Sequence, residues 1–211
     1  MGITQQIGAS SLIKPGVIDN TAARPASPFE GQMVYEKDTD MLAIWNGTAW
    51  RYIAAATPTY GTVLQVATVN KSDTFTTTST SFTDVTGLSV SITPKSTTST
   101  VLVIASLSLG ATYGTNSTYA KLVRGSTDIA IGDAAGSRTR ASVTAEPNGN
   151  SLETASIVYL DSPATTSSTT YKIQICTNGA GTAAINRSVD DSNAAGRSRN
   201  FSSVALMEIA G

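Results

Sequence analysis

Histidine is absent from the 211-residue chain, and its absence excludes several kinds of active site. Nucleophile pairs of the Ser–His and Cys–His kinds cannot form, and the commonest zinc ligand is missing. The sequence also has no glycine-rich loop leading from a strand into a helix, the pattern that cradles nucleotide phosphates. Paired carboxylates that hydrolyse a glycoside remain as the only route to catalysis. The acidic candidates for such a pair are Glu146, Glu153, Asp161, Asp190 and Asp191. We expect them to be solvated loop and turn residues instead, so we expect neither an enzyme nor a cofactor.

Cysteine and charge are also scarce. Cys176 is the only cysteine, so no disulfide can form within the chain, and the alternating apolar residues before it predict a packed thiol. Charged residues make up 14% of the chain, against about 25% in ordinary soluble domains. The formal net charge is −1 and the basic residues are scattered, so nothing favours nucleic acid or an anionic membrane surface as a partner.

Long apolar runs are missing as well. No segment approaches the roughly 20 apolar residues that span a bilayer, so we expect no membrane insertion. Two short acidic segments, residues 38–40 and 190–193, contain oxygen ligands suited to a hard cation. Neither has the spacing of a calcium loop, and Asp and Asn are ordinary turn formers. We expect turns there and no metal site, with cation binding as the alternative.

Serine and threonine are abundant in place of charge, most densely in "SDTFTTTSTSFTDVTG" and "SPATTSSTTY". Threonine is β-branched and suits a pleated surface, so this composition favours strands over helices. From Val63 onward, eight short alternating segments are separated by clusters of Gly, Ser, Pro and Asn. Residues 101–109 are apolar on both faces, at Leu102 and Ile104, as expected of a central strand. We predict an all-β chain in which residues 57–65 are a linker and residues 66–211 form an antiparallel β-sandwich, a jelly-roll head domain.

Residues 1–30 are predicted to form an extended arm. Pro15, Pro25 and Pro28 restrict the backbone and disfavour regular structure there. The apolar residues of this segment have too few neighbours to bury them, which predicts an arm that anchors on another chain; a disordered tail is the alternative. These anchoring candidates are Ile3, Ile7, Leu12, Ile13, Val17 and Ile18.

Residues 31–56 hold both tryptophans of the chain and are predicted to form a three-stranded β-meander. Asn46-Gly47 is a strong signal for a two-residue hairpin turn, which would pair Trp45 with Thr48 and Ala43 with Trp50. Both faces of so small a sheet are then apolar, and such sheets need further packing for stability. We therefore predict an interface with other copies or with the main domain; a carbohydrate platform of the two tryptophans is the alternative. The predicted interface residues are Tyr35, Ile44, Trp45, Trp50 and Tyr52.

Three polar segments, residues 112–119, 133–151 and 189–200, are expected to be long loops of the sandwich. Loops on a rigid scaffold are the usual place for recognition, although solvated connections are the alternative. Their tyrosine, asparagine and arginine side chains suit sugars or a neighbouring protein. The candidate receptor-facing residues are Tyr113, Asn116, Tyr119, Arg138 and Arg197.

The segment "RPASPFEGQMVYEKDTDMLAIWNGTAW" resembles a module found near the N-termini of tailed-bacteriophage fibre and decoration proteins. In that module Arg-Pro, Pro-x-x-Gly-Gln, Tyr-Glu-x-Asp-Thr and Trp-Asn-Gly-x-x-Trp recur in this order. Most of residues 66–209 is similar to the trimeric, tumour-necrosis-factor-like jelly-roll heads of phage fibres. The similar motifs are "SFTDVTGLSVSITP", "LVRGSTDIAIG", "YLDSP", "TYKIQI" and "SSVALMEI".

The resemblance implies a homotrimer displayed on the virion surface. It implies a structural protein whose N-terminal part is anchored on another virion protein, the major capsid protein or a tail protein, and whose head faces outward. The alternative is a tail-fibre receptor-binding protein that recognises a host surface glycan. A polysaccharide-degrading tailspike is not expected from a chain of this length.

Overall fold

The computed structural model describes residues 15–53, 60–112 and 116–211. The predicted all-β fold is confirmed, because the described chain consists of strands and one short 3-10 helix. It divides into two compact units, Met1–Thr57 and Pro58–Gly211. Across the described residues, no helix has the length and apolar character needed to cross a bilayer.

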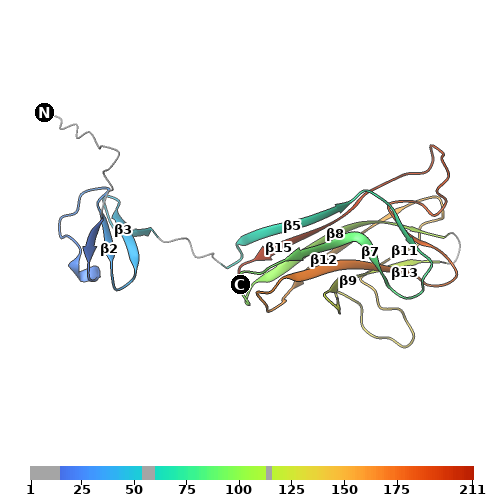
Figure 1. Ribbon diagram of the computed structural model, residues 1–211, viewed down its shortest axis with the longest axis horizontal. Coiled ribbons are helices and arrows are strands. Elements are labelled where there is room, and N and C mark those ends of the chain that lie inside the picture. The colour runs from blue at the N-terminus through green and yellow to red at the C-terminus, as the bar shows by residue number, and fades with distance from the viewer. Residues whose placement is uncertain (1–14, 54–59, 113–115) are drawn as a thin grey trace. The chain divides into compact units, whose positions relative to one another are not determined.

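The first unit is a four-stranded sheet (Figure 1). Its strands are β1 (Gly16–Ile18), β2 (Met33–Glu36), β3 (Met41–Trp45) and β4 (Trp50–Ile53), in that order, and the 3-10 helix Thr21–Ala23 lies between β1 and β2. The meander is confirmed in β2, β3 and β4, but the boundary expected at residue 31 is wrong. Val17 and Ile18, assigned to an unpaired arm, pair in parallel with Tyr35 and Glu36. Parallel pairing joins segments distant in the chain, so no local pattern indicated this strand.

The tryptophan hairpin has a different register from the predicted one. Trp45 pairs with Trp50, and Ala43 pairs with Tyr52, so the loop has four residues rather than two. The Asn46 side chain causes the difference, because its Oδ1 accepts hydrogen bonds from the backbone N–H groups of Thr48 and Ala49 at 3.1 and 2.8 Å. Such an asparagine turn competes with the tight hairpin turn.

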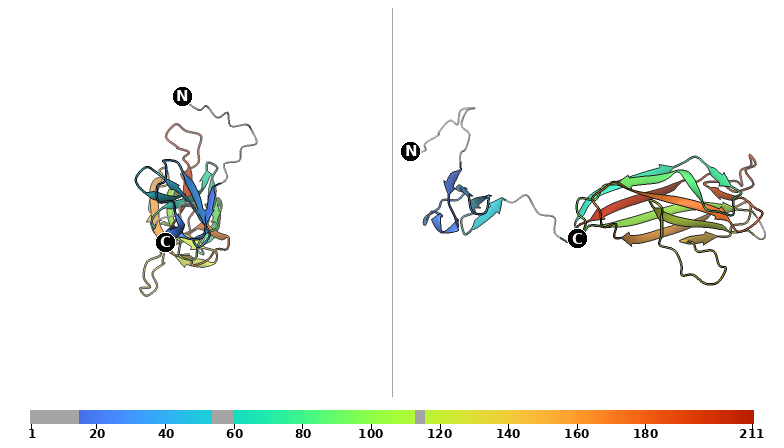
Figure 2. Two further views of the ribbon diagram at one scale, coloured as in Figure 1. Left: turned by 90° about the vertical axis from the view of Figure 1, so that its left-hand side faces the viewer. Right: turned by 60° about the horizontal axis from the view of Figure 1, so that its bottom comes forward.

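The head is an antiparallel sandwich of two sheets, which Figure 2 shows as two layers. The first, here called the β9 sheet, has the order β10–β9–β13–β7, with β11 also on β9. Its strands are β7 (Thr83–Ile92), β9 (Thr118–Arg124), β10 (Thr127–Ile129), β11 (Val143–Ala145) and β13 (Thr169–Thr177).

The second sheet, here called the β8 sheet, has the order β5–β15–β8–β14–β6, and β12 pairs with the other edge of β8. The long strand β8 (Thr100–Ala111) is therefore its centre, as residues 101–109 predicted. The other strands are β5 (Val63–Lys71), β6 (Phe75–Thr77), β12 (Glu153–Asp161), β14 (Ala183–Ile185) and β15 (Ser202–Ile209).

The core lies between the two sheets and follows the period of two along each strand. Leu107, Leu122, Ile173 and Leu206 are fully buried there. Burying one such side chain contributes about 1.5–3 kcal/mol. Tyr171 is fully buried as well, and its hydroxyl donates to Asp161 at 2.6 Å.

The head has two distinct ends. At one end, here called the base, Gly61 donates a backbone hydrogen bond to Ala210, so the start of the domain and the C-terminus lie together. At the opposite end, here called the loop end, β8 passes into β9, β13 into β14, and β14 into β15 (Figure 1). The described residues of the polar segments 112–119 and 189–200 therefore gather at the loop end.

Candidate assembly and recognition surfaces

The outer face of the β8 sheet carries apolar residues in register across four strands. Met207 is opposite both Val66 and Leu102, and Leu102 is opposite Leu160, which makes a continuous row. The next row along the strands comprises Thr68, Ala205, Ile104 and Val158. We call these two rows the assembly face.

The apolar side chains on the two edge strands of the assembly face are exposed, whereas Leu102 and Met207 in its middle are half-buried. Val158 is 67% exposed, Val66 55% and Leu160 54%, whereas their strand neighbours Ala67 and Ile157 turn inward to the core. Alternation explains the inward residues, since one face of each strand must line the sandwich. It does not explain why the outward positions are apolar too. Contiguous exposed apolar patches on soluble proteins mark interaction sites.

The strands that carry the assembly face have no charged side chain on their outer side. The outward positions of β5, β15, β8 and β12 hold only apolar residues or Ser, Thr and Asn. The outer face of the β9 sheet is different, because Lys172 pairs with Asp84 at 2.8 Å and Lys121 pairs with Asp128 at 2.7 Å. The Lys172 ammonium lowers the pKa of the Asp84 carboxyl below its ordinary value. The outer face of the β9 sheet is thus suited to contact with solvent. The apolar rows on the outer face of the β8 sheet are suited to burial against another surface.

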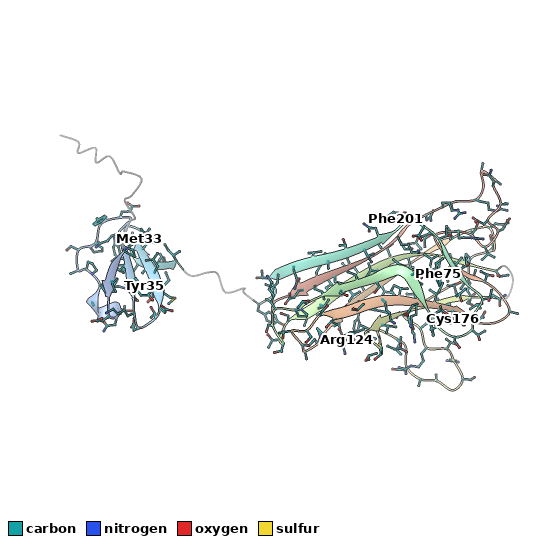
Figure 3. The ribbon with its side chains drawn as sticks, viewed as in Figure 1. Met33, Tyr35, Phe75, Arg124, Cys176 and Phe201 are labelled. Carbon is teal, nitrogen blue, oxygen red and sulfur yellow. The ribbon has the colours of Figure 1, made fainter. Side chains whose placement is uncertain are left out.

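A hollow of about 590 Å³ lies on the β8 sheet toward the loop end, beyond the apolar rows. Phe201 stands at its rim, 64% exposed, close to the end of β5 (Figure 3). Asn200 donates from its side chain to the Ser108 hydroxyl at 2.9 Å. The lining residues are Ser72, Ser106, Ser108, Thr154, Arg199, Asn200 and Phe201.

Both tryptophans are half-buried in the small unit. Their rings meet edge to face with centroids 5.8 Å apart, on the same side of the sheet as buried Val34 and Ala43. The Arg24 guanidinium lies 5.8 Å from the centre of the Trp50 ring and 5.3 Å from that of Tyr52. The connection from β1 to β2 supplies Arg24, which covers part of this face, while Tyr52 is still 40% exposed, so the interface expected on this face stays a prediction. An edge-to-face pair is also not the flat platform considered for carbohydrate.

A buried carboxylate fixes this cover. Glu36 is fully buried and is paired with the Arg24 guanidinium. It also accepts hydrogen bonds from the hydroxyls of Tyr52 at 2.9 Å and Thr21 at 3.2 Å. The hydrogen bond from Arg24 is the main reason that the pKa of Glu36 lies below its ordinary value.

The other two predicted interface residues lie on the opposite face of the small sheet. Tyr35 is opposite Leu42, and Ile44 is opposite Met33, both in the register of β2 with β3. Val17 and Ile53 belong to the same face, and each is more than half exposed. This second face therefore retains the apolar character predicted for an interface.

The structure does not bring the predicted receptor-facing residues together. Asn116 lies at the loop end and packs against Gly181. A Cβ atom added to Gly181 would lie only 2.6 Å from the side-chain nitrogen of Asn116. Arg138 is exposed in the connection from β10 to β11, and Arg197 is bound to Asp190 at 2.6 Å. Tyr119 is a residue of β9, opposite Cys176, and not a loop residue as expected. Tyr113 lies outside the described residues, as do Ile3, Ile7, Leu12 and Ile13 of the predicted arm.

The acidic segments are engaged by other side chains. Asp191 accepts from Arg199 at 2.7 Å and from Arg187 at 3.1 Å, and Asp40 accepts from the Tyr35 hydroxyl. Within the described ranges, no three His, Cys, Asp or Glu residues gather in a way that could hold a metal ion.

No protein-family model matches the chain, and a search among curated proteins finds no match. What the chain does must therefore be inferred from these surfaces.

Proposed function

We propose that the chain is a structural protein of a bacteriophage virion, displayed on the particle surface as a homotrimer that assembles through the assembly face of the head. The observation that carries this proposal is the uncharged apolar register of Val66, Met207, Leu102 and Leu160. Interface cores are depleted of charged residues, as this face is. The phage-like motifs of about residues 23–50 and of the head are the basis for proposing a virion location and three copies.

A second copy of the chain suits the assembly face better than a charged partner. Its outward residues contain no charge to be repelled when the same surface meets itself, and no charge to be paired with a different protein. Each large apolar side chain that leaves water contributes about 1.5–3 kcal/mol. The ion-paired face of the β9 sheet then remains in solvent around the outside of the assembly.

The small unit is proposed to anchor the protein on another virion protein, either the major capsid protein or a tail protein. Two features support this role. Val17 and Ile53 leave one face of its sheet apolar and exposed, and Phe29 is an exposed aromatic ring in the preceding connection. Burial of these side chains against a partner would stabilise attachment, while the head stays free.

The location of the protein on intact particles tests this function. An antibody against the head, detected by immunogold labelling, should decorate the virion surface, and particles made without the gene product should lose the label. Label over the capsid would identify a head-decoration protein, and label on the tail would identify a fibre. Particles that carry no label, although the protein is present in the infected cell, would overturn the proposal.

A double substitution separates anchoring from assembly. Val17→Asp with Ile53→Asp should prevent attachment to particles, because both carboxylates would replace exposed apolar side chains on the proposed anchoring face. The matched control is Thr39→Asp with Thr48→Asp, at exposed turn positions of the same unit. Attachment of the Val17/Ile53 variant at the level of the control would refute the anchoring role.

A further inference from the structure

The hollow at the loop end of the β8 sheet is built by four segments that are distant in the sequence, and Ser72 comes from the connection after β5. β8 contributes Ser106 and Ser108, β12 contributes Thr154, and the connection into β15 contributes Phe201. The register places Thr154 opposite Ser108, so their side chains share the outer face. Its volume of about 590 Å³ is in the range of roughly 300–1,000 Å³ that is typical of ligand sites. From this lining we propose that the hollow binds a neutral saccharide.

Phe201 supplies an exposed apolar ring on a fixed stretch of backbone. It is 64% exposed, yet the residue after it, Ser202, is fully buried and donates to the Asn186 side chain at 2.7 Å. The residue before it, Asn200, donates its backbone N–H to Asn186 at 3.1 Å. The backbone on both sides of the ring is therefore held in place. A preorganised aromatic face can receive the C–H groups of a pyranose ring with little loss of freedom on binding.

The remaining lining residues offer hydrogen bonds that a sugar can use. In the part of the chain that the structure describes, the hydroxyls of Ser106 and Thr154 have no hydrogen-bond partner. A hydroxyl both donates and accepts, as sugar hydroxyls do, so either group can satisfy a sugar in either direction. A wholly apolar ligand would instead cover these groups without partners, which costs free energy. Hydroxyls around one aromatic ring therefore select a saccharide over an aliphatic ligand.

The charge near the hollow is already engaged. Arg199 binds Asp191 at 2.7 Å, and this is the only charged side chain that lines the hollow. The groups offered to a ligand are thus neutral hydroxyls, an amide and a ring, which suits an uncharged sugar. The inference rests on the hollow alone and does not require the homotrimer or the virion role.

Saturation-transfer NMR on the full chain tests the inference, with the methyl glycosides of glucose, galactose, mannose, rhamnose and N-acetylglucosamine as probes. At least one probe should receive saturation, strongest at ring C–H protons, and Phe201→Ala should abolish it. Tyr60→Ala is the matched control, because Tyr60 is 87% exposed at the base, away from the hollow. Thr154→Val keeps the shape and removes one hydroxyl, so it should weaken binding about tenfold.

The outcomes are distinguishable from failure of the assembly proposal. Melting temperatures like that of the wild type would show that each variant folds. Val158→Glu, which is designed to disrupt assembly, should bind the same probe as the wild type does. The inference is overturned if no probe binds, if Phe201→Ala binds as well as the wild type, or if Tyr60→Ala abolishes binding. Binding confined to Val158→Glu would also overturn it for the assembled protein.

Discussion

Val158→Glu should convert the assembled protein to monomers while leaving each head folded. Val158 is 67% exposed in the second row of the assembly face, directly opposite Ile104. A carboxylate introduced there would be buried without a partner on assembly, because the outward residues around it carry no positive charge. Outside the assembly the same side chain would remain in water, so the free energy of unfolding of one head should change by less than about 0.5 kcal/mol.

The magnitude follows from the cost of burying an ion. Removing a carboxylate from water without compensation costs several kcal/mol, and a value of about 3 kcal/mol per copy is a cautious choice. Three copies then lose about 9 kcal/mol of assembly free energy, in addition to the lost valine contacts. Because about 1.4 kcal/mol corresponds to a factor of ten, the association constant should fall by roughly a million-fold or more.

Two further variants rank the effect. Val158→Thr has a similar shape and adds only a hydroxyl, so it should weaken assembly less than the glutamate does. Ser89→Glu is the matched control, since Ser89 lies exposed on the outer face of the β9 sheet, opposite Lys172. Sedimentation velocity at several protein concentrations measures the series. Assembly that is unchanged in Val158→Glu, or equally reduced in Ser89→Glu, would refute the reasoning.

Three other perturbations probe the two units separately. Arg24→Ala should destabilise the small unit by about 3 kcal/mol, because it leaves Glu36 buried without its cation. Tryptophan fluorescence measures this unit alone, since it holds both tryptophans, and an unchanged unfolding transition would contradict the account. The pKa of Glu36 is below its ordinary value of 4.5, so its contribution is complete above pH 4.5 and is lost as the pH falls through the folded-state pKa; the same fluorescence should show the loss in acid, and stability that rises with acidification would contradict it. Tyr171→Phe removes the hydrogen bond to buried Asp161 and should lower the free energy of unfolding of the head by about 1–3 kcal/mol. Chemical denaturation followed by far-UV circular dichroism measures this change, and a variant as stable as the wild type would show that the bond contributes nothing.

Alternation and turn residues predicted most strands of the head, but they missed two short ones, β6 and β11, and β11 lies within the loop expected at residues 133–151. A hairpin joins β9 to β10, and Gly125 in its turn takes a positive φ of 59°. Alternation and turn residues are local features, so each can be recognised within a single segment of the sequence. The parallel pairing of β1 with β2 was missed because it depends on the connection that carries Arg24 across the sheet.

The surfaces were harder to predict than the strands. Leu102 and Ile104 were correctly placed on a central strand. However, an apolar face has the same sequence pattern whether it packs against the same chain or against another copy. The register with Val158 and Met207, together with the exposure of Ile104 and Val158, shows that no described strand of the head lies over this face. The hollow could not be predicted either, because Phe201 meets the strand hydroxyls only after folding. No spacing in the sequence links these segments.

The mass of the wild-type protein in solution tests the central claim most directly. Sedimentation equilibrium at micromolar concentration should give about 65 kDa, three times the 21.7 kDa of one chain. A particle of 21.7 kDa at every concentration would mean that the assembly face stays in water, and the homotrimer would be contradicted.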